Sequence, residues 1–224
     1  MSRASERAYG QIRNMILSGE LSSGTQIREE HLAASCGVSR TPVRDALRRL
    51  EAEQFIRRSD TQRSFVADWS IGDVEDAFQL RAMLEAHAAK RAATRVSWDQ
   101  LERLRSHNKT ILKSISDDRT DVPTFIEHNR LFHAIILDAA ESERLSIMLA
   151  QVIEQPVVLR TALQYDRENL QRSWHEHEEL LAAFTHRDAD WASAVMTSHI
   201  RRAFHAYSEA HKHGADGAHN DIAA

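Results

Sequence analysis

The sequence predicts a mainly α-helical protein with two domains: a small N-terminal domain that ends in a β-hairpin, and a C-terminal antiparallel bundle of about six helices. Three observations support this fold class. Only 7 glycines and 3 prolines occur in 224 residues, while 42% of residues are hydrophobic and 28% charged, which is typical of a folded chain with long helices. Apolar residues recur at helical spacing after residue 70. The length also fits two small domains.

Composition excludes several classes of protein. No apolar run reaches the ~18 residues of a membrane span, and the N-terminus MSRASERAYG lacks the apolar core of a signal peptide. We therefore expect a cytoplasmic protein without a membrane partner. The single cysteine, Cys36, cannot form an internal disulfide and is expected to pack as a small apolar group.

The N-terminal domain, residues 1–68, is expected to begin with an amphipathic helix that Gly19 ends. Its apolar positions are Ala8, Ile12, Met15 and Ile16. A short helix should then run from about Glu29 to Cys36, because Gly37 can adopt the left-handed turn that follows a helix.

The next helix is expected to start at Ser39 and to carry two stripes of side chains. The apolar stripe, spaced i, i+3, i+4 and i+7, consists of Val43, Ala46, Leu47 and Leu50. Arg40, Arg44 and Arg48 form a second stripe about 110° away. Pro42 falls in the first turn, where its missing N–H costs little. One face of this helix should therefore pack while another presents arginines.

Two helices joined by a glycine turn, followed by a hairpin, form a winged helix-turn-helix. The hairpin is predicted from the β-prone runs 54–58 and 63–67 around a polar turn. Residues 39–64 hold seven arginines and four acidic residues, and arginine pairs bidentately with guanine and phosphate. Double-stranded DNA is the partner this predicts, and a solvated charged face is the alternative.

Charge is divided unevenly between the two domains. Residues 1–68 carry 11 basic and 9 acidic residues, a net charge of +2, and the remainder carries 18 and 24, a net charge of −6. The more positive part is the one that carries the helix-turn-helix pattern.

Residues 8–68 resemble the winged-helix domain of the GntR family of bacterial transcription regulators. The resemblance is carried by the runs AYGQIRNMILSG, GVSRTPVRDALRRLEAE and FIRR. The resemblance implies that Arg40 and Arg44 contact the operator and that Ser39 and Thr41 lie near phosphates. The full DNA-binding set expected is Ser39, Arg40, Thr41, Arg44, Arg48, Arg63 and Ser64. The sequence departs from the family pattern at Glu30, often an arginine, and at Gln54 and Ser64, usually glycines.

The second domain, residues 69–212, should be helical throughout. Breaks between helices are expected at Arg95–Ser97, Ser116–Pro123, Ala140–Ser142, Tyr165–Arg167 and His186–Asp190. These breaks give six helices. The tail, residues 213–224, is small and polar with little to bury, so we expect it to be disordered.

Three of these helices each place a histidine on an apolar face. They are His133, with Asn129 one turn earlier, His177 and His199. Buried polar groups need partners, and a metal ion or hydrogen-bonded neighbours in the core could both supply them. Arg81 lies on the inner face of the first helix, where Glu85 or the carboxylate of a ligand could pair with it. The spacing leaves both questions open.

The segments EHNRLFHAIILDAAESERL, HEHEELLAAFTHRDADWASAV and MTSHI resemble the FCD effector domain of the FadR-type subgroup. Members commonly bind a divalent metal through an aspartate and three histidines. The matching positions are Asn129, His133, His177 and His199, with a metal of the Zn, Ni or Mn class. Asn129 replaces the usual aspartate, and a neutral amide is a weaker ligand that leaves the site more positive. By the same resemblance, Arg81 binds a carboxylate effector.

These observations predict a transcription regulator, acting as a repressor, and not an enzyme. It would bind a two-fold operator as a homodimer and respond to a small organic acid. Two alternatives are a metal sensor with no organic effector and a metal-dependent hydrolase. A hydrolase needs a general base, but no glutamate is plainly inward beside the three histidines. The run His175-Glu-His-Glu-Glu also lacks the second histidine of HExxH.

Overall fold

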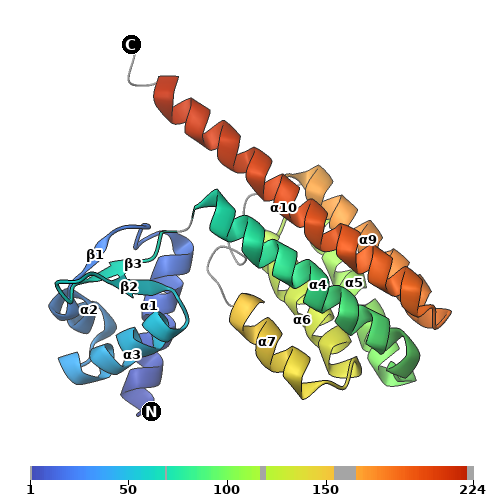
Figure 1. Ribbon diagram of the computed structural model, residues 1–224, viewed down its shortest axis with the longest axis horizontal. Coiled ribbons are helices and arrows are strands. Elements are labelled where there is room, and N and C mark those ends of the chain that lie inside the picture. The colour runs from blue at the N-terminus through green and yellow to red at the C-terminus, as the bar shows by residue number, and fades with distance from the viewer. Residues whose placement is uncertain (1, 69, 117–119, 154–164, 221–224) are drawn as a thin grey trace. The chain divides into compact units, whose positions relative to one another are not determined.

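The computed structural model describes residues 2–68, 70–116, 120–153 and 165–220, with side chains up to residue 209. The chain divides into two compact units near residue 73, compared with the boundary expected after Asp68. Each unit is described by itself (Figure 1).

The N-terminal unit contains three helices and a small sheet. Its elements are α1 (Arg3–Ser18), β1 (Gln26–Ile27), α2 (Glu29–Cys36), α3 (Arg40–Ala52), β2 (Ile56–Arg58) and β3 (Ser64–Val66). The strands are antiparallel in the order β1-β3-β2, with Phe65 opposite both Gln26 and Arg57. The helix-turn-helix and the hairpin are thus confirmed. Strand β1 was not predicted, because two residues are too few to show an alternating pattern.

Local signals explain the ends of these helices. Gly19 and Gly37 end α1 and α2 in the left-handed conformation, at φ +83° and +61°. A glycine has no Cβ to oppose this conformation. Gln54, at a position where the family that the sequence resembles usually has glycine, is also left-handed at φ +62°, which costs a residue with a side chain about 1–2 kcal/mol.

The core of the N-terminal unit forms where α1 and α3 pack together. The predicted apolar stripe of α3 is buried, with each of its four side chains no more than 2% exposed. Cys36 is buried in the same cluster as a small apolar group. Burial of this stripe fixes the rotation of α3 and so leaves the arginine stripe at the surface.

The second unit is a helical bundle. Its described helices are α4 (Ile71–Arg95), α5 (Trp98–Ser116), α6 (Val122–Ala139), α7 (Glu143–Ile153), α9 (Arg167–Thr185) and α10 (Ala189–Asn220). The predicted breaks thus fall between the described helices, and residues 154–164 lie outside the description. Asp121 and Asp166 cap α6 and α9 by accepting hydrogen bonds from backbone N–H groups.

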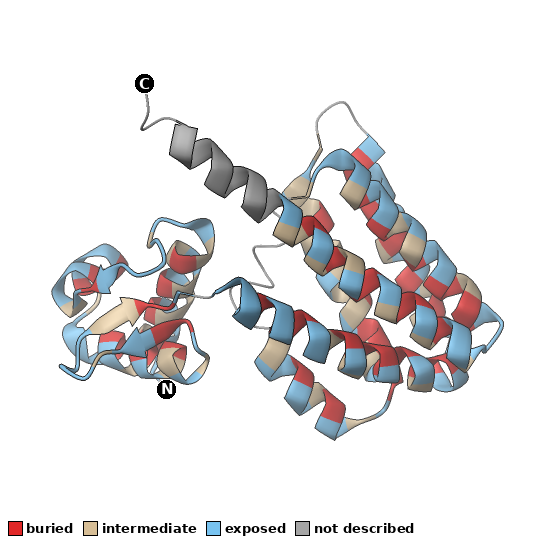
Figure 2. Cartoon of the chain, turned by 45° about the horizontal axis from the view of Figure 1, so that its top comes forward, coloured by how far each residue is buried: buried red, intermediate tan, exposed pale blue. Residues whose placement is uncertain are grey.

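Helix α5 packs against α6 and α9, and α9 packs against α10. Figure 2 shows that buried residues gather along one side of each helix. One core cluster contains Ile111, Ile115, Phe125 and Leu170. Apolar burial on three or more helices is what positions the few polar side chains that lie among them.

The C-terminal tail differs from expectation. Disorder was expected from His213, but α10 continues as helix to Asn220. Adding a residue to an existing helix is far easier than starting one, so a helix can extend past its last buried residue. Residues 221–224 lie outside the description. Among the described residues, none of the helices is both long and apolar enough to cross a membrane.

Candidate metal centre and nucleic-acid interface

Three histidines from three helices meet inside the second unit. His133 lies on α6, His177 on α9 and His199 on α10, and one ring nitrogen of each lies within 4.8 Å of the others. The Nε2 atoms of His133 and His199 are 3.2 Å apart. The structure therefore brings together the three histidines that the sequence singled out.

Each histidine is held through its other nitrogen. The Nδ1 atom of His133 lies 2.6 Å from Glu85 Oε2, and that of His199 lies 2.7 Å from Glu176 Oε2. The Nδ1 atom of His177 lies 3.2 Å from Asn108 Oδ1. Ionised carboxylates only accept hydrogen bonds, so the Nδ1 atoms of His133 and His199 carry the protons. Metal-binding histidines are oriented by carbonyl and carboxylate partners in this way.

This arrangement leaves the Nε2 lone pairs facing one another. His177 Nε2 is buried and has no hydrogen-bond partner among the described residues. An unpaired buried polar atom costs about 1–3 kcal/mol. Unprotonated Nε2 atoms at 3.2 Å also repel each other unless a proton or a cation lies between them. The donor set therefore fits a metal ion with imidazole ligands, such as Zn²⁺ or Ni²⁺.

A second layer of side chains supports the first. Glu85 accepts a hydrogen bond from Arg81 Nε at 2.8 Å. Glu176 accepts two from Arg202, both at 2.7 Å. The ring of Phe132 stacks on His177 with centroids 4.0 Å apart. The three imidazoles are therefore held in place before any ligand binds.

The charges around the cluster suit a cation. Burial lowers the pKa of His177 well below its usual value, and the neighbouring histidines lower it further. Burial also lowers the pKa of His199, against the opposing effect of Glu176. Both rings are therefore neutral at neutral pH, which is the form that binds metals.

The two supporting carboxylates stay ionised. Burial opposes ionisation of Glu85, but the charge of Arg81 and the hydrogen bond from His133 outweigh it and lower its pKa to about 2. Burial likewise opposes ionisation of Glu176, and hydrogen bonds from His199 and Arg202 lower its pKa to about 2. Both carboxylates can therefore orient the imidazoles over the whole physiological pH range.

The other two residues predicted for this centre are Asn129 and Arg81. Asn129 is half-buried on α6, one turn before His133, and no hydrogen bond joins it to the three histidines in the described part of the chain. The Arg81 side chain is 11% exposed and forms an ion pair with Glu85, the partner that the sequence suggested as an alternative to a ligand. Its role toward an effector stays a prediction.

Sequence reasoning missed the supporting residues Asn108, Glu176 and Arg202. The expectation that no glutamate lies beside the histidines was wrong, since Glu85 and Glu176 both contact one. Each is paired with an arginine and faces Nδ1, so neither is a free base on the Nε2 side. A signal for Asn108 existed, because it interrupts the stripe of buried apolar residues on α5.

Tyr165 lies close to the second layer. Burial raises the pKa of Tyr165 to about 12, although the nearby charges of Arg202 and Arg81 oppose this rise. Its side chain packs against the cluster of apolar residues that includes Phe125 and Leu170.

The candidate nucleic-acid interface lies on α3 of the other unit. Arg40, Arg44 and Arg48 are exposed along one stripe. Arg40 contacts Glu30 at 3.0 Å and Glu29 at 3.3 Å, and Arg44 contacts Glu29 at 2.8 Å.

Arg48 pairs with Asp45 on the same helix. Each guanidinium of the stripe is therefore held by an acidic side chain. The sequence pattern did not reveal these pairings.

The remaining predicted DNA-binding residues flank this stripe. Ser39 occupies the N-cap position of α3 but makes no capping hydrogen bond through its side chain, and Thr41 is exposed. Arg63 is exposed immediately before β3, while Ser64 pairs with Ile27 and Arg58 in the sheet. The left-handed residue near the tip of the hairpin is Gln62, at φ +59°.

Each of the two units matches a known protein family. Residues 4–66 match the family described as bacterial regulatory proteins, gntR family, and residues 76–202 match the FCD domain. The chain is 28% identical over 144 residues to an uncharacterised HTH-type transcriptional regulator, YdhC, of Bacillus subtilis, covering 64% of each chain. It is 28% identical over 197 residues to the gluconate operon transcriptional repressor of Bacillus licheniformis, covering 85% of this chain and 80% of that protein.

A solved structure has the same fold. The structure of McbR/YncC from E. coli superposes with a TM-score of 0.77 at 20% identity, over 93% of this chain and 99% of that one. At this identity the likeness concerns the fold alone.

Proposed function

The chain belongs to the GntR family of bacterial transcription regulators and carries an FCD domain, and from this we propose that it is a repressor controlled by a small carboxylate bound beside a metal ion. It is a DNA-binding regulator and not an enzyme. In the proposal, a homodimer binds a two-fold operator and its affinity for the operator changes when the helical unit takes up the carboxylate.

The observation that carries the metal and effector part is the set of converging Nε2 atoms, with His177 Nε2 buried and unpaired. His133, His177 and His199 would hold the metal, and Asn129 is the fourth candidate. When bound, the metal would supply a positive centre with a free coordination position for an oxygen ligand.

Charge balance supports an anionic effector. Arg81 is neutralised by Glu85 and Arg202 by Glu176, and His177 and His199 are neutral at neutral pH. Because Asn129 replaces the aspartate of related domains, no carboxylate of this ligand set offsets a divalent cation. An anion is therefore the favoured ligand, and a carboxylate is the group that metals and arginines both bind well.

The DNA part rests on the arginine stripe of α3. A recognition helix lies in the major groove with its N-terminal residues at the base edges, and Arg40 and Arg44 occupy the first half of α3. Repression is supported by relatives that are named as repressors, among them the gluconate operon transcriptional repressor of Bacillus licheniformis. The effector can shift DNA affinity only by its difference in affinity for the DNA-competent and incompetent states.

Metal content is the first test. The purified chain is stripped with a chelator, incubated with Zn²⁺, Ni²⁺ or Mn²⁺, desalted and analysed for metal. Wild type and His175→Ala are expected to retain one equivalent, and His177→Ala to retain none. His175 is the matched control because it lies on the same helix and is exposed. The metal site would be overturned if His177→Ala retained the metal as wild type does, or if wild type itself bound no metal.

Effector response is the second test. Thermal melting with a panel of small carboxylic acids, each paired with its amide, identifies the acid that stabilises the metal-loaded protein. The same acid should change operator affinity, measured by fluorescence anisotropy with a duplex selected from a random pool. If metal alone changes operator affinity and no acid does, the chain is a metal sensor instead.

A further inference from the structure

Two histidines outside the three-histidine centre meet between α5 and α6. The Nδ1 atom of His107 on α5 lies 3.0 Å from the Nδ1 atom of His128 on α6. Their ring centroids are 5.1 Å apart, and the ring planes are tilted by 52°. Neither ring belongs to the group of histidines that forms the buried centre. The pair is therefore a second place where side chains that bind metals come together.

The pair is open to water. Both side chains are half-buried, whereas Asn108, the next residue along α5, is fully buried. Asn108 contacts His177 on α9, so the two neighbouring side chains of α5 extend toward different helices. A ligand from solvent can therefore reach the pair without entering the core of the bundle.

The contact between the two Nδ1 atoms admits two explanations. In a neutral imidazole one nitrogen carries the proton and the other carries a lone pair. A hydrogen bond between the rings needs a proton on exactly one of the two Nδ1 atoms. When both protons are on Nε2, two lone pairs face each other across 3.0 Å, and a cation between them satisfies both at once.

The distance fits two ligands of one metal ion. Imidazole nitrogens lie about 2.0–2.1 Å from Zn²⁺, so two of them at a bond angle of about 90–110° are about 2.9–3.4 Å apart. The observed separation of 3.0 Å falls within this range. The centroid separation of 5.1 Å also equals that of His199 from His133 and from His177 in the buried centre. The two rings thus have the spacing of the rings that the proposed centre uses.

The protonation state of the pair also suits a cation. Burial lowers the pKa of His107, and the charge of His128 lowers it further. Arg103 has the same effect and Glu127 opposes it. His107 is therefore neutral at neutral pH, which is the form that binds metals. Arg103 is exposed, so its repulsion of a bound cation is screened by water and salt.

We propose that His107 and His128 form a second metal site, which binds a divalent ion of the Cu, Ni or Zn class through both Nδ1 atoms. Imidazole suits these ions, and Cu²⁺ binds most tightly to a given set of ligands. Two protein ligands leave the other coordination positions to water, so this ion should bind more weakly than an ion held by three histidines. The site depends on the contact between α5 and α6 and not on the proposed function.

The second ion would link two helices that support the buried centre. Helix α5 carries Asn108, which contacts His177, and α6 carries His133. An ion that binds only the folded chain stabilises it. Occupation of the second site should therefore hold α5 against α6 and raise the Tm of the protein.

Equilibrium titration with Ni²⁺ tests the site, because a weakly held ion is lost during desalting. Wild type is loaded with one equivalent of Ni²⁺, desalted to leave only tightly bound metal, and titrated with Ni²⁺ by calorimetry. A further, weaker equivalent is expected. Changes to the partners of metal ligands alone cost about 10- to 100-fold in affinity, so His107→Gln and His128→Gln, which each remove a ligand, should weaken this step by about tenfold or more.

The glutamine variants separate the two explanations of the contact. Glutamine can still form a hydrogen bond with the remaining ring, but its neutral amide is a poor ligand for these ions. A role in hydrogen bonding alone therefore predicts no change in Ni²⁺ binding. Circular dichroism verifies that both variants fold.

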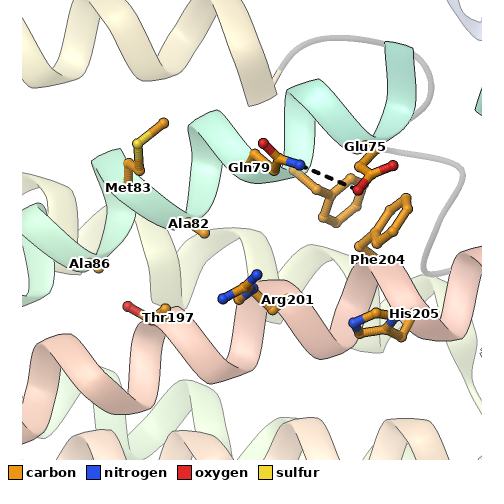
Figure 3. Close-up of a pocket in the computed structure, with 10 residues that line it drawn as sticks. Glu75, Gln79, Ala82, Met83, Ala86, Thr197, Arg201, Phe204 and His205 are labelled. Atoms are coloured by element: carbon orange, nitrogen blue, oxygen red, sulfur yellow. Dashed lines mark hydrogen bonds between the residues drawn. The ribbon is translucent and has the colours of Figure 1, made fainter. Parts of the chain in front are cut away.

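His205→Gln is the matched control, because it removes an exposed histidine that has no histidine beside it. Figure 3 shows His205 in a groove between α4 and α10, and it is the single histidine among the described residues that line this groove. The control should take up the weaker equivalent as wild type does.

The proposal is overturned if wild type takes up no Ni²⁺ beyond the first equivalent, or if both glutamine variants bind it as wild type does. The proposed three-histidine centre is tested separately by the tightly bound equivalent. If wild type retains no metal after desalting but still shows the weaker step that depends on His107 and His128, the buried centre is refuted and the second site stands.

Discussion

Glu30→Gln is expected to tighten binding to DNA. Glu30 contacts the guanidinium of Arg40 at 3.0 Å, and Glu29 contacts the same group at 3.3 Å. To reach a base edge or a phosphate, Arg40 has to exchange at least part of these contacts. The carboxylate of Glu30 therefore competes with DNA for Arg40, and its own charge repels the phosphates.

The size of the effect follows from exposure. The side chains of Arg40 and Glu30 are 52% and 79% exposed, so the ion pair contributes only about 0–1 kcal/mol. Removing both the competition and the repulsion is worth roughly 0.5–1 kcal/mol in each half-site. A dimer on two half-sites then gains about 1–2 kcal/mol, a rise in affinity of about 5- to 30-fold.

Fluorescence anisotropy with an operator duplex and a scrambled duplex measures this effect at several salt concentrations. Each phosphate contact that Glu30→Gln adds should steepen the slope of log K against log salt by about 0.9. The scrambled duplex should gain at least as much as the operator, because phosphate contacts carry no sequence information. Selectivity should therefore fall as affinity rises.

Glu20→Gln is the control, because it changes net charge equally and makes no ion pair with the arginines of α3 among the described residues. The reasoning is refuted if Glu30→Gln binds the operator more weakly than wild type. It is also refuted if its affinity and salt slope match those of Glu20→Gln.

Three further predictions concern the helical unit. In the metal-free protein, burial holds the pKa values of His177 and His199 below the usual 6.5. Their contribution to the free energy of unfolding should therefore be complete above pH 6.5 and be lost as the pH falls toward their folded-state pKa values. Urea unfolding between pH 5 and 8 measures this loss. Arg81→Met should destabilise the fold by about 3–5 kcal/mol because it leaves the buried carboxylate of Glu85 without its arginine, with only the hydrogen bond to His133 remaining. Adding Glu85→Gln should recover much of the loss in the same assay, and an unchanged stability of the single variant would show that the ion pair has no structural role. Restoring Zn²⁺ at ~1,000 times its Kd to chelated protein should raise the free energy of unfolding by about 4 kcal/mol, measured by calorimetry, and His177→Ala should show no such gain.

The sequence predicted the elements whose signals are local. The apolar stripe of α3 and the glycines at residues 19 and 37 are complete within a few residues, so helix ends and rotations could be located in advance. The three histidines could be singled out because each interrupts an apolar face of its own helix.

The partners of those histidines could not be predicted, because they depend on contacts across the bundle. Asn108 reaches His177 over 69 positions, and Glu85 reaches His133 over 48. A hydrogen bond between distant helices depends on their rotation and axial position, which periodicity in one helix does not set. The pairing of Glu30 with Arg40 spans only 10 positions, yet it depends on how α2 and α3 cross.

Helix α4 supports the proposed metal centre from its buried side. Arg81 pairs with Glu85 there, and Glu85 holds the imidazole of His133. A carboxylate effector that draws Arg81 away from Glu85 would change the charge that holds α4 against α6. Because packed helices respond by small shifts or rotations, such a change would alter the packing of the bundle and, in the proposed regulator, its affinity for the operator. We therefore expect Arg81→Met to retain the metal on its three histidines but to lose the effect of the effector on operator affinity, measured by metal analysis and by fluorescence anisotropy.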